Sequence, residues 1–145
     1  MSTKIKKAII SLSDKSDIKL ILNTLKKYKV HVISSGGTSK DIRKLGFKCT
    51  EVSEYTNTDE MLDGSVKTLQ PKLYADILNK RQNKSHKKEL KKNNYEEIDL
   101  VIVNFYPFEA KLKSTKNHNK LIENIDIGGP TLVRAAAKNY KYTTV

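Results

Sequence analysis

The sequence has too few cysteines, clustered histidines and long apolar runs for a disulfide, a zinc site or a membrane span. It has one cysteine, Cys49, so no internal disulfide can form, and we expect a reducing, cytoplasmic location. The histidines stand singly at positions 31, 86 and 118 without the spacing of metal ligands, and we expect no metal. No apolar run could span a bilayer, and the one behind the basic N-terminus is too short for an export signal. We therefore expect no membrane contact.

Acidic residues are also scarce relative to basic ones. Lysine and arginine number 28 against 16 acidic residues, which gives a formal net charge of +12. Such an excess can indicate a nucleic-acid partner. The densest lysine run, Lys80 to Lys92, contains no aromatic residue, whereas RNA-binding modules usually interleave aromatics or arginines with their lysines. We interpret the run as a solvated helix or loop and regard nucleic acid as the less favoured partner.

Strand-like and helix-like segments alternate along the chain, which indicates a single domain, residues 1–145. Apolar residues at helical spacing occupy 18–25, and a second helix is predicted to begin at Thr38 and to stop at Gly46. The predicted strands are Lys6–Ser13, Val30–Ser34, 47–52, Asp99–Phe105 and 141–145. The alternation predicts a three-layer α/β fold, in which a mostly parallel sheet is flanked by helices.

The loops that follow the predicted strands carry the unusual residues, which is where such folds bind ligands. In "SSGGTS", Gly36 and Gly37 allow backbone N–H groups to approach an anion, and the helix that follows adds positive potential. Ser35 and Thr38 can add hydroxyl donors, and Lys15 in "SDKS" can add a cation. A tight turn capped by serine or threonine would explain the same residues. The segment therefore predicts either a phosphate site or a simple turn.

In the stretch "DIGGP", residues 128–130 are two of the chain's six glycines and one of its three prolines. They stand before an alanine-rich helix. Pro130 suits the first helical position, because its missing N–H is not needed there. Asp126 can accept a proton or simply charge the helix N-terminus. Lys138 lies roughly 12 Å from Pro130 along the helix, at about 1.5 Å per residue. It could act at the same site or be a surface lysine.

Two further segments add groups that can hold or move protons. Lys67 and Thr68 lie in "VKTLQP", and Asn104 and Tyr106 lie in "NFYPF". Together with Asp126 they suggest acid–base chemistry on an anionic small molecule, without a metal or cofactor.

The segments "SLSDKS", "SSGGTSKDIRKLG", "VKTL", "DLVIVNFYPFE" and "IENIDIGGPTLVRAAAKN" occur in this order. They resemble the inosine-monophosphate cyclohydrolase domain, of methylglyoxal-synthase-like fold, found in the bifunctional purine-biosynthesis enzyme whose other half is a formyltransferase. The resemblance implies closure of 5-formamidoimidazole-4-carboxamide ribotide to inosine monophosphate. It also allows a homodimer, and a formyltransferase partner on a separate chain.

The resemblance also assigns residues to roles. Its proton-handling set comprises Lys67, Tyr106, Asp126 and Lys138. The residues that it implies for binding the purine ribotide are Ser13, Asp14, Lys15, Ser35, Gly36, Gly37, Thr38, Thr68, Val103, Asn104, Ile127 and Gly128. Among these, the amides of Ile127 and Gly128 would hold the formyl oxygen as charge builds on it.

Three positions depart from the family pattern. Ser65 replaces an arginine expected to contact the nucleotide, Gln70 replaces a histidine, and Asp76 replaces a glycine. The resemblance also implies that the chain ends before this domain normally does and that the formyltransferase half is absent. A non-catalytic nucleotide-binding module of the same fold is therefore the alternative to an enzyme.

Overall fold

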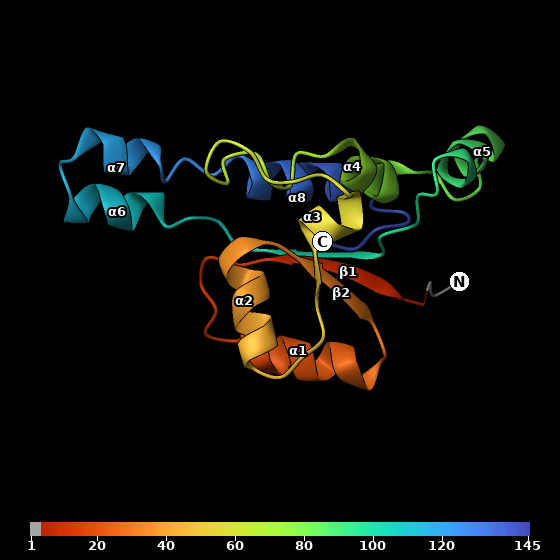
Figure 1. Cartoon of the computed structure of the whole chain (residues 1–145), viewed down its shortest axis with the longest axis horizontal. Helices are drawn as coiled ribbons and strands as arrows, with labels where there is room; N and C mark the ends of the chain where they lie inside the picture. Colours follow the sequence, from red (N-terminus) through yellow and green to blue (C-terminus); the bar gives the residue numbers. More distant parts are fainter. Residues whose placement is uncertain (1–3) are drawn as a thin grey trace.

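The computed structural model describes residues 4–145 and contains one four-stranded sheet (Figure 1). Residues 1–3, the start of the segment considered as an export signal, lie outside the described residues. The strands are β1 (Lys7–Ser11), β2 (His31–Ser34), β3 (Thr50–Glu51) and β4 (Leu100–Val103). They run parallel in the order β3-β2-β1-β4, so β1 pairs with both β2 and β4. The predicted parallel α/β fold is confirmed.

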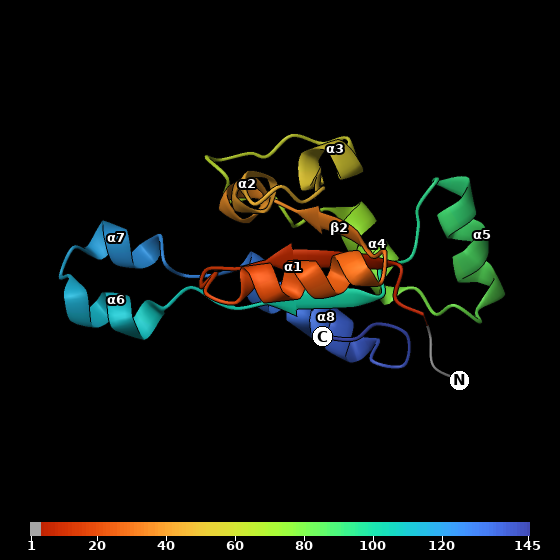
Figure 2. The ribbon, with the colours of Figure 1, turned by 90° about the horizontal axis from the view of Figure 1, so that it is seen from below.

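Helices cover both faces of the sheet (Figures 1 and 2). The helices α1 (Ile18–Lys27) and α2 (Gly36–Lys44) pack on one face, and α3 (Val52–Thr56), α4 (Pro71–Leu78) and α8 (Gly128–Lys138) pack on the other. Successive residues of β1 point to opposite faces. Ala8 and Ile10 belong to the core under α1 and α2, whereas Ile9 belongs to the core under α4 and α8. Each fully buried isoleucine contributes about 1.5–3 kcal/mol, so both faces stabilise the sheet.

Two predicted helix features are confirmed. In α1, Ile18, Leu22 and Leu25 are buried while the polar face is exposed. The chain leaves α2 at Gly46, whose φ of +81° suits glycine, and the Gly46 N–H donates to the Arg43 carbonyl at 2.9 Å.

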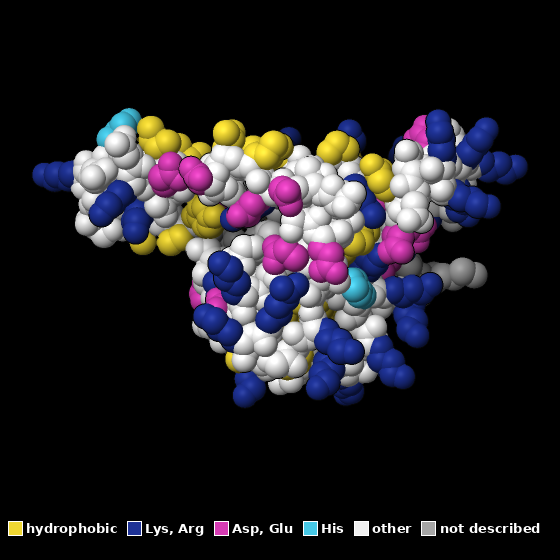
Figure 3. All heavy atoms as spheres, viewed as in Figure 1, with side chains coloured by type: hydrophobic (Ala, Val, Ile, Leu, Met, Phe, Trp, Pro, Cys, Tyr) yellow, Lys and Arg dark blue, Asp and Glu magenta, His cyan; other side chains and the backbone are white. Residues whose placement is uncertain are grey.

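Three helices project from the body and bury no residue. The lysine-rich helix α5 (Lys84–Lys92) extends from one end, and the hairpin of α6 (Phe108–Ser114) and α7 (His118–Ile122) extends from the other (Figures 1 and 2). Figure 3 shows lysines and arginines over α5 and around α1, rather than gathered at one spot. Within residues 4–145, no helix combines the length and apolar character needed to cross a bilayer. The α6–α7 hairpin was not predicted from the sequence.

Several predicted boundaries were wrong, and the predicted strands Lys6–Ser13 and Asp99–Phe105 are shorter in the structure, at Lys7–Ser11 and Leu100–Val103. The predicted strand over 141–145 contributes only one bridge, between Thr144 and Leu100, because a turn precedes it in which Tyr142 and Thr143 donate to the Asn139 carbonyl. The predicted strand over 47–52 shrinks to Thr50–Glu51, since α3 begins at the next residue. Pro130 is the third residue of α8 rather than the first.

Charged side chains are paired where the strands begin. Asp99, buried just before β4, accepts hydrogen bonds from the backbone N–H groups of Lys6 and Lys7 at 2.7 and 2.9 Å. Its other carboxylate oxygen lies 2.7 Å from Nη2 of Arg81. The Lys7 ammonium forms an ion pair with Glu96. These contacts tie β1 to β4 at their amino ends.

Asp76 lies beside this group and is fully buried. It accepts hydrogen bonds from the Tyr55 hydroxyl at 2.6 Å and from the Glu96 N–H at 3.0 Å. The Lys72 and Lys7 ammonium groups lie 4.3 and 5.0 Å from the centre of the Tyr55 ring. Burial raises the pKa of Asp76 to about 6, although its hydrogen bond from Tyr55 and the nearby lysines act in the opposite direction. We call Asp99, Arg81, Lys7, Glu96, Asp76, Tyr55 and Lys72 the amino-end cluster.

Candidate functional site

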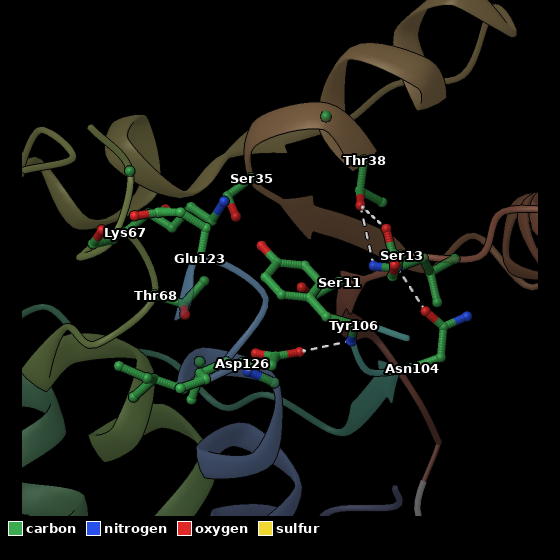
Figure 4. Close-up of a pocket in the computed structure, with 18 of the residues that line it drawn as sticks. Ser11, Ser13, Ser35, Thr38, Lys67, Thr68, Asn104, Tyr106, Glu123 and Asp126 are labelled. Atoms are coloured by element: carbon green, nitrogen blue, oxygen red, sulfur yellow. Dashed lines mark hydrogen bonds between the residues drawn. The ribbon is translucent and has the colours of Figure 1, made fainter. Parts of the chain in front are cut away.

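A cavity of about 560 Å³ opens at the carboxyl ends of β1, β2 and β4 (Figure 4). It lies between the N-termini of α2 and α8 and the base of the α6–α7 hairpin. The predicted site residues that line it are Ser13, Lys15, Ser35, Gly37, Thr38, Lys67, Thr68, Asn104, Tyr106, Asp126, Ile127 and Gly128. Four predicted residues, Asp14, Gly36, Val103 and Lys138, do not line it.

The loop after β1 is held by Asn104, which follows β4. Its Oδ1 accepts from the N–H groups of Ser13 and Asp14 at 2.6 and 3.1 Å, and its Nδ2 donates to the Asp14 carbonyl at 2.7 Å. The Asp14 carboxylate accepts from the Ser16 N–H at 2.9 Å, and this hydrogen bond lowers the pKa of Asp14. Asn104 thus positions the loop, and the Asp14 side chain is occupied outside the cavity.

The N-terminus of α2 forms a second wall. The helix begins at Gly36 rather than at the predicted Thr38. Gly36 has a φ of +55°, and its N–H donates to a carboxylate oxygen of Glu51 at 3.1 Å, so it is unavailable to the cavity. The Thr38 hydroxyl donates to the Leu12 carbonyl and accepts from the Leu12 N–H, at 3.0 and 3.1 Å. Gly37, in the first turn, leaves an amide without an intrahelical acceptor.

Two lysines lie against this helix start. A Cβ atom on Gly37 would be 3.3 Å from the Lys15 ammonium, and one on Gly36 would be 3.3 Å from the Lys67 ammonium. Lys15 also forms a 2.6 Å ion pair with Asp41, whose pKa this contact lowers. Two cations and the helix N-terminus therefore make this wall favourable for an anion.

The N-terminus of α8 forms the opposite wall and needs its glycines. A Cβ atom on Gly128 would come within 2.5 Å of the Thr68 hydroxyl, and one on Gly129 within 2.8 Å of the Asp126 carboxylate. Asp126 accepts from the Gly129 N–H at 2.9 Å and from the Tyr106 N–H at 3.3 Å. Asp126 thereby caps α8 and fixes the loop after β4, and the Tyr106 ring extends into the cavity (Figure 4).

The departures from the family pattern separate in space. Ser65 lines the cavity, so the arginine of the family pattern would stand in the cavity wall. Gln70 is buried at the start of α4, outside the cavity, and Asp76 belongs to the amino-end cluster. Only Ser65 therefore changes the cavity wall directly.

Lys138 is not brought to this site. It is exposed at the last residue of α8 and lines a separate hollow of about 290 Å³ with Lys80, Lys141 and two tyrosines. The helix carries it roughly 15 Å from Gly128 at about 1.5 Å per residue. Val103 ends β4 and packs against the core instead of the cavity.

The α6–α7 hairpin and the loop after it bring residues to the cavity that were not predicted from the sequence. Ile122, Glu123 and Ile125 line it just before Asp126. Their nearness in sequence to Asp126 was the available signal. Among the described residues, no three histidine, cysteine or acidic side chains stand close enough together to hold a metal ion.

The fold and the position of the cavity define a parallel α/β domain with an open cavity at the carboxyl ends of its strands. The family model described as "MGS-like domain" matches residues 17–131, and the chain belongs to this family. It is 49% identical over 142 residues to the bifunctional purine biosynthesis protein PurH of Acetivibrio thermocellus, and 46% identical over 143 residues to that of Magnetococcus marinus. The resemblance found in the sequence is thereby confirmed at the level of the domain.

The matches cover nearly all of this chain but only part of each PurH relative. The chain is covered to 97% and 98%, yet it spans only 28% and 27% of those two PurH proteins. The crystal structure of ForH superposes with a TM-score of 0.81 at 26% identity, covering 97% of this chain and 74% of ForH.

Proposed function

We propose that this domain is an inosine-monophosphate cyclohydrolase, which closes 5-formamidoimidazole-4-carboxamide ribotide to inosine monophosphate. The carboxamide nitrogen attacks the formyl carbon, and a carbon–nitrogen bond forms. The formyl oxygen leaves as water, with one proton from the carboxamide nitrogen and one from the formamide nitrogen. The observation that carries the proposal is a cavity with helix N-termini on two opposite walls, in a domain similar to part of bifunctional purine biosynthesis proteins.

The ribotide phosphate fits the wall formed by α2. The free amide of Gly37 and the Lys15 ammonium supply donors and positive charge there. Ser13 and Ser35 add polar groups to the same cavity. The phosphate would therefore anchor one end of the ligand.

The reacting groups fit the wall formed by α8. The first-turn amides at Ile127 and Gly128 lack intrahelical acceptors and can hold the formyl oxygen as negative charge develops on it. Lys67 can stabilise charge on the formyl and carboxamide oxygens. Tyr106 and Asp126 can relay protons from the nitrogens, because each carboxylate oxygen of Asp126 keeps a second lone pair. Lys138 is too far along α8 to join this relay in the present arrangement.

A turnover assay tests the proposal. Ultraviolet absorbance should report conversion of the formamido ribotide to inosine monophosphate. Lys67→Ala should reduce turnover about a hundredfold or more, since it removes charge stabilisation and proton handling. The matched control is Lys40→Ala, which removes an exposed lysine outside the cavity. Folded wild-type protein that converts no ribotide above the uncatalysed rate would exclude the activity.

A non-catalytic nucleotide-binding module is the second candidate. It is favoured by Ser65 in the cavity wall and by the distance of Lys138 from the cavity. It predicts saturable binding of inosine monophosphate by calorimetry with no turnover in the same preparation. As for the second activity, we propose that the PurH relatives carry a formyltransferase in their additional length, on the same chain as the matching domain rather than on a separate one.

A further inference from the structure

The end of α7 brings a carboxylate to the cavity that no assigned role uses. Glu123 is the C-cap residue that follows α7, and its N–H donates to the Asn119 carbonyl at 3.1 Å. Its neighbours Ile122 and Ile125 line the cavity as well, so this segment forms part of the wall. The backbone of Glu123 is therefore held in place while its side chain is exposed to the cavity.

Glu123 differs from the other carboxylates around the cavity because they are already engaged. Asp126 accepts from two backbone N–H groups, Asp41 is paired with Lys15, and Glu51 accepts from Gly36. Within residues 4–145, the Glu123 carboxylate has neither a hydrogen-bond partner nor an ion-pair partner. It is an unused acceptor in the cavity wall.

The position of Glu123 restricts what it can accept from. In Figure 4 its side chain lies toward Lys67 and Ser35, at the Gly36 end of the α2 wall, and well away from Ser13 and Asn104. Ser13 lies at the loop that also holds Lys15, on the side assigned to the phosphate. A carboxylate accepts hydrogen bonds only, and it would repel a phosphate placed against it. It suits a neutral donor on the rest of the ligand.

We propose that Glu123 is a specificity-determining residue that accepts a hydrogen bond from a neutral O–H or N–H donor on the ribose or base of the bound ribotide. This proposal rests on the ribotide-binding part of the proposed function. It assigns the phosphate to the α2 wall and the selection of what is attached to the phosphate to the α6–α7 hairpin. The domain would then distinguish a ribotide from other small phosphates by the hydrogen bond to Glu123.

The test compares affinities for three ligands by calorimetry: inosine monophosphate, ribose 5-phosphate and inorganic phosphate. Glu123→Ala should weaken inosine monophosphate about ten- to a hundredfold, as expected for a lost hydrogen bond to a charged group, and Glu123→Gln should weaken it less. Inorganic phosphate should bind both variants as well as wild type or better, because a negative charge has been removed. The matched control, Glu109→Ala, removes the same charge from α6 of the same hairpin outside the cavity.

The pattern across ligands decides the result. Weakening of both inosine monophosphate and ribose 5-phosphate supports a ribose donor, and weakening of inosine monophosphate alone supports a base donor. Unchanged affinities, or equal weakening of all three ligands, would overturn the proposal, as would wild-type protein that binds no ribotide. Binding without turnover would remove the cyclohydrolase activity and leave the Glu123 result intact.

Discussion

The two ends of the same sheet use similar side chains in opposite ways. At the amino ends of the strands, Asp99 and Arg81 are paired with each other and Asp76 is bonded to Tyr55. At the carboxyl ends, Lys67 and Tyr106 face a cavity, and two helix N-termini leave amides open. The first arrangement stabilises the fold, and the second leaves groups available to a ligand. Residue type alone does not distinguish these two uses. They differ in whether the side chain already has a partner within the protein.

The direction of the chain explains why the two ends differ. In a parallel sheet, helices that follow the strands begin at the carboxyl ends, so free amides and positive helix potential collect there. The amino ends receive helix C-termini and returning loops instead. The comparison predicts that substitutions at the amino-end cluster change stability, whereas substitutions at the cavity change binding.

The largest effect should follow from breaking the amino-end cluster at Asp99. Asp99→Ala leaves Arg81 and two backbone N–H groups without their acceptor, and such losses cost about 3–5 kcal/mol when the pair is buried. Urea denaturation should show this loss. Asp14→Ala, an exposed carboxylate at the other end, is the control and should change stability little. Equal losses in the two variants would contradict the proposed difference between the ends.

The next effect is a pH dependence at Asp76. Because burial raises its pKa from 3.8 to about 6, the folded state binds a proton more tightly than the unfolded chain does. Stability from this group is full below pH 3.8 and is lost as the pH rises through 6, by up to about 3 kcal/mol at about 1.4 kcal/mol per pKa unit. The free energy of unfolding of wild type minus that of Asp76→Asn should therefore fall between pH 4 and pH 7. A constant difference would mean that Lys7 and Lys72 offset the burial fully.

At the cavity, Gly37→Val should affect binding without affecting the fold. The added side chain would crowd the Lys15 ammonium, which lies 3.3 Å from the Cβ position, and would cover the open amide. We expect inorganic phosphate and inosine monophosphate to bind about tenfold more weakly, which is about 1.4 kcal/mol. Thermal unfolding should change little, because Gly37 is exposed. An unchanged dissociation constant would place the anion on another wall.

The smallest effect concerns Lys138, which belongs to neither end of the comparison. Lys138→Ala should leave the affinity for inosine monophosphate within about twofold, since the residue lines a separate hollow. The same calorimetric titration, with Lys67→Ala as the contrasting variant, checks this. Loss of turnover in Lys138→Ala with unchanged affinity would show that α8 reaches the reacting groups in an arrangement other than this one.

Much of the carboxyl-end cavity could be predicted because its signals are local. Glycine pairs before helices, and lysines and hydroxyls after strands, identify the walls at Gly37 and Gly128 without any knowledge of packing. Gly36 could not be separated from Gly37 in this way, because the acceptor of its amide is Glu51, fifteen residues away. Lys138 is a different case, because a motif that continues along one helix does not place all its residues at one cavity, and the role predicted for Lys138 stays a prediction.

The amino-end cluster and the hairpin could not be predicted for a different reason. Asp76 and Tyr55 are 21 residues apart, and Asp99 meets the start of β1 across more than 90 residues. Such pairs depend on the completed fold. The α6–α7 hairpin buries no residue, and its apolar side chains, such as Phe108, Leu112 and Ile122, stay largely exposed, so no core contact identifies it in the sequence.

The strand order also has a consequence for the sequence of events in folding. The strands β1, β2 and β3 lie within the first 51 residues and can associate through short crossovers soon after they are synthesised. β4 pairs with β1 from the other side, and the Ser13–Asn104 hydrogen bond joins residues 91 positions apart. Contacts of such long range form slowly, because the intervening chain must first be ordered. The cavity can therefore exist only after β4 has docked, and a chain arrested before that step would have α1 to α4 on the two faces of the sheet but no place for a ligand.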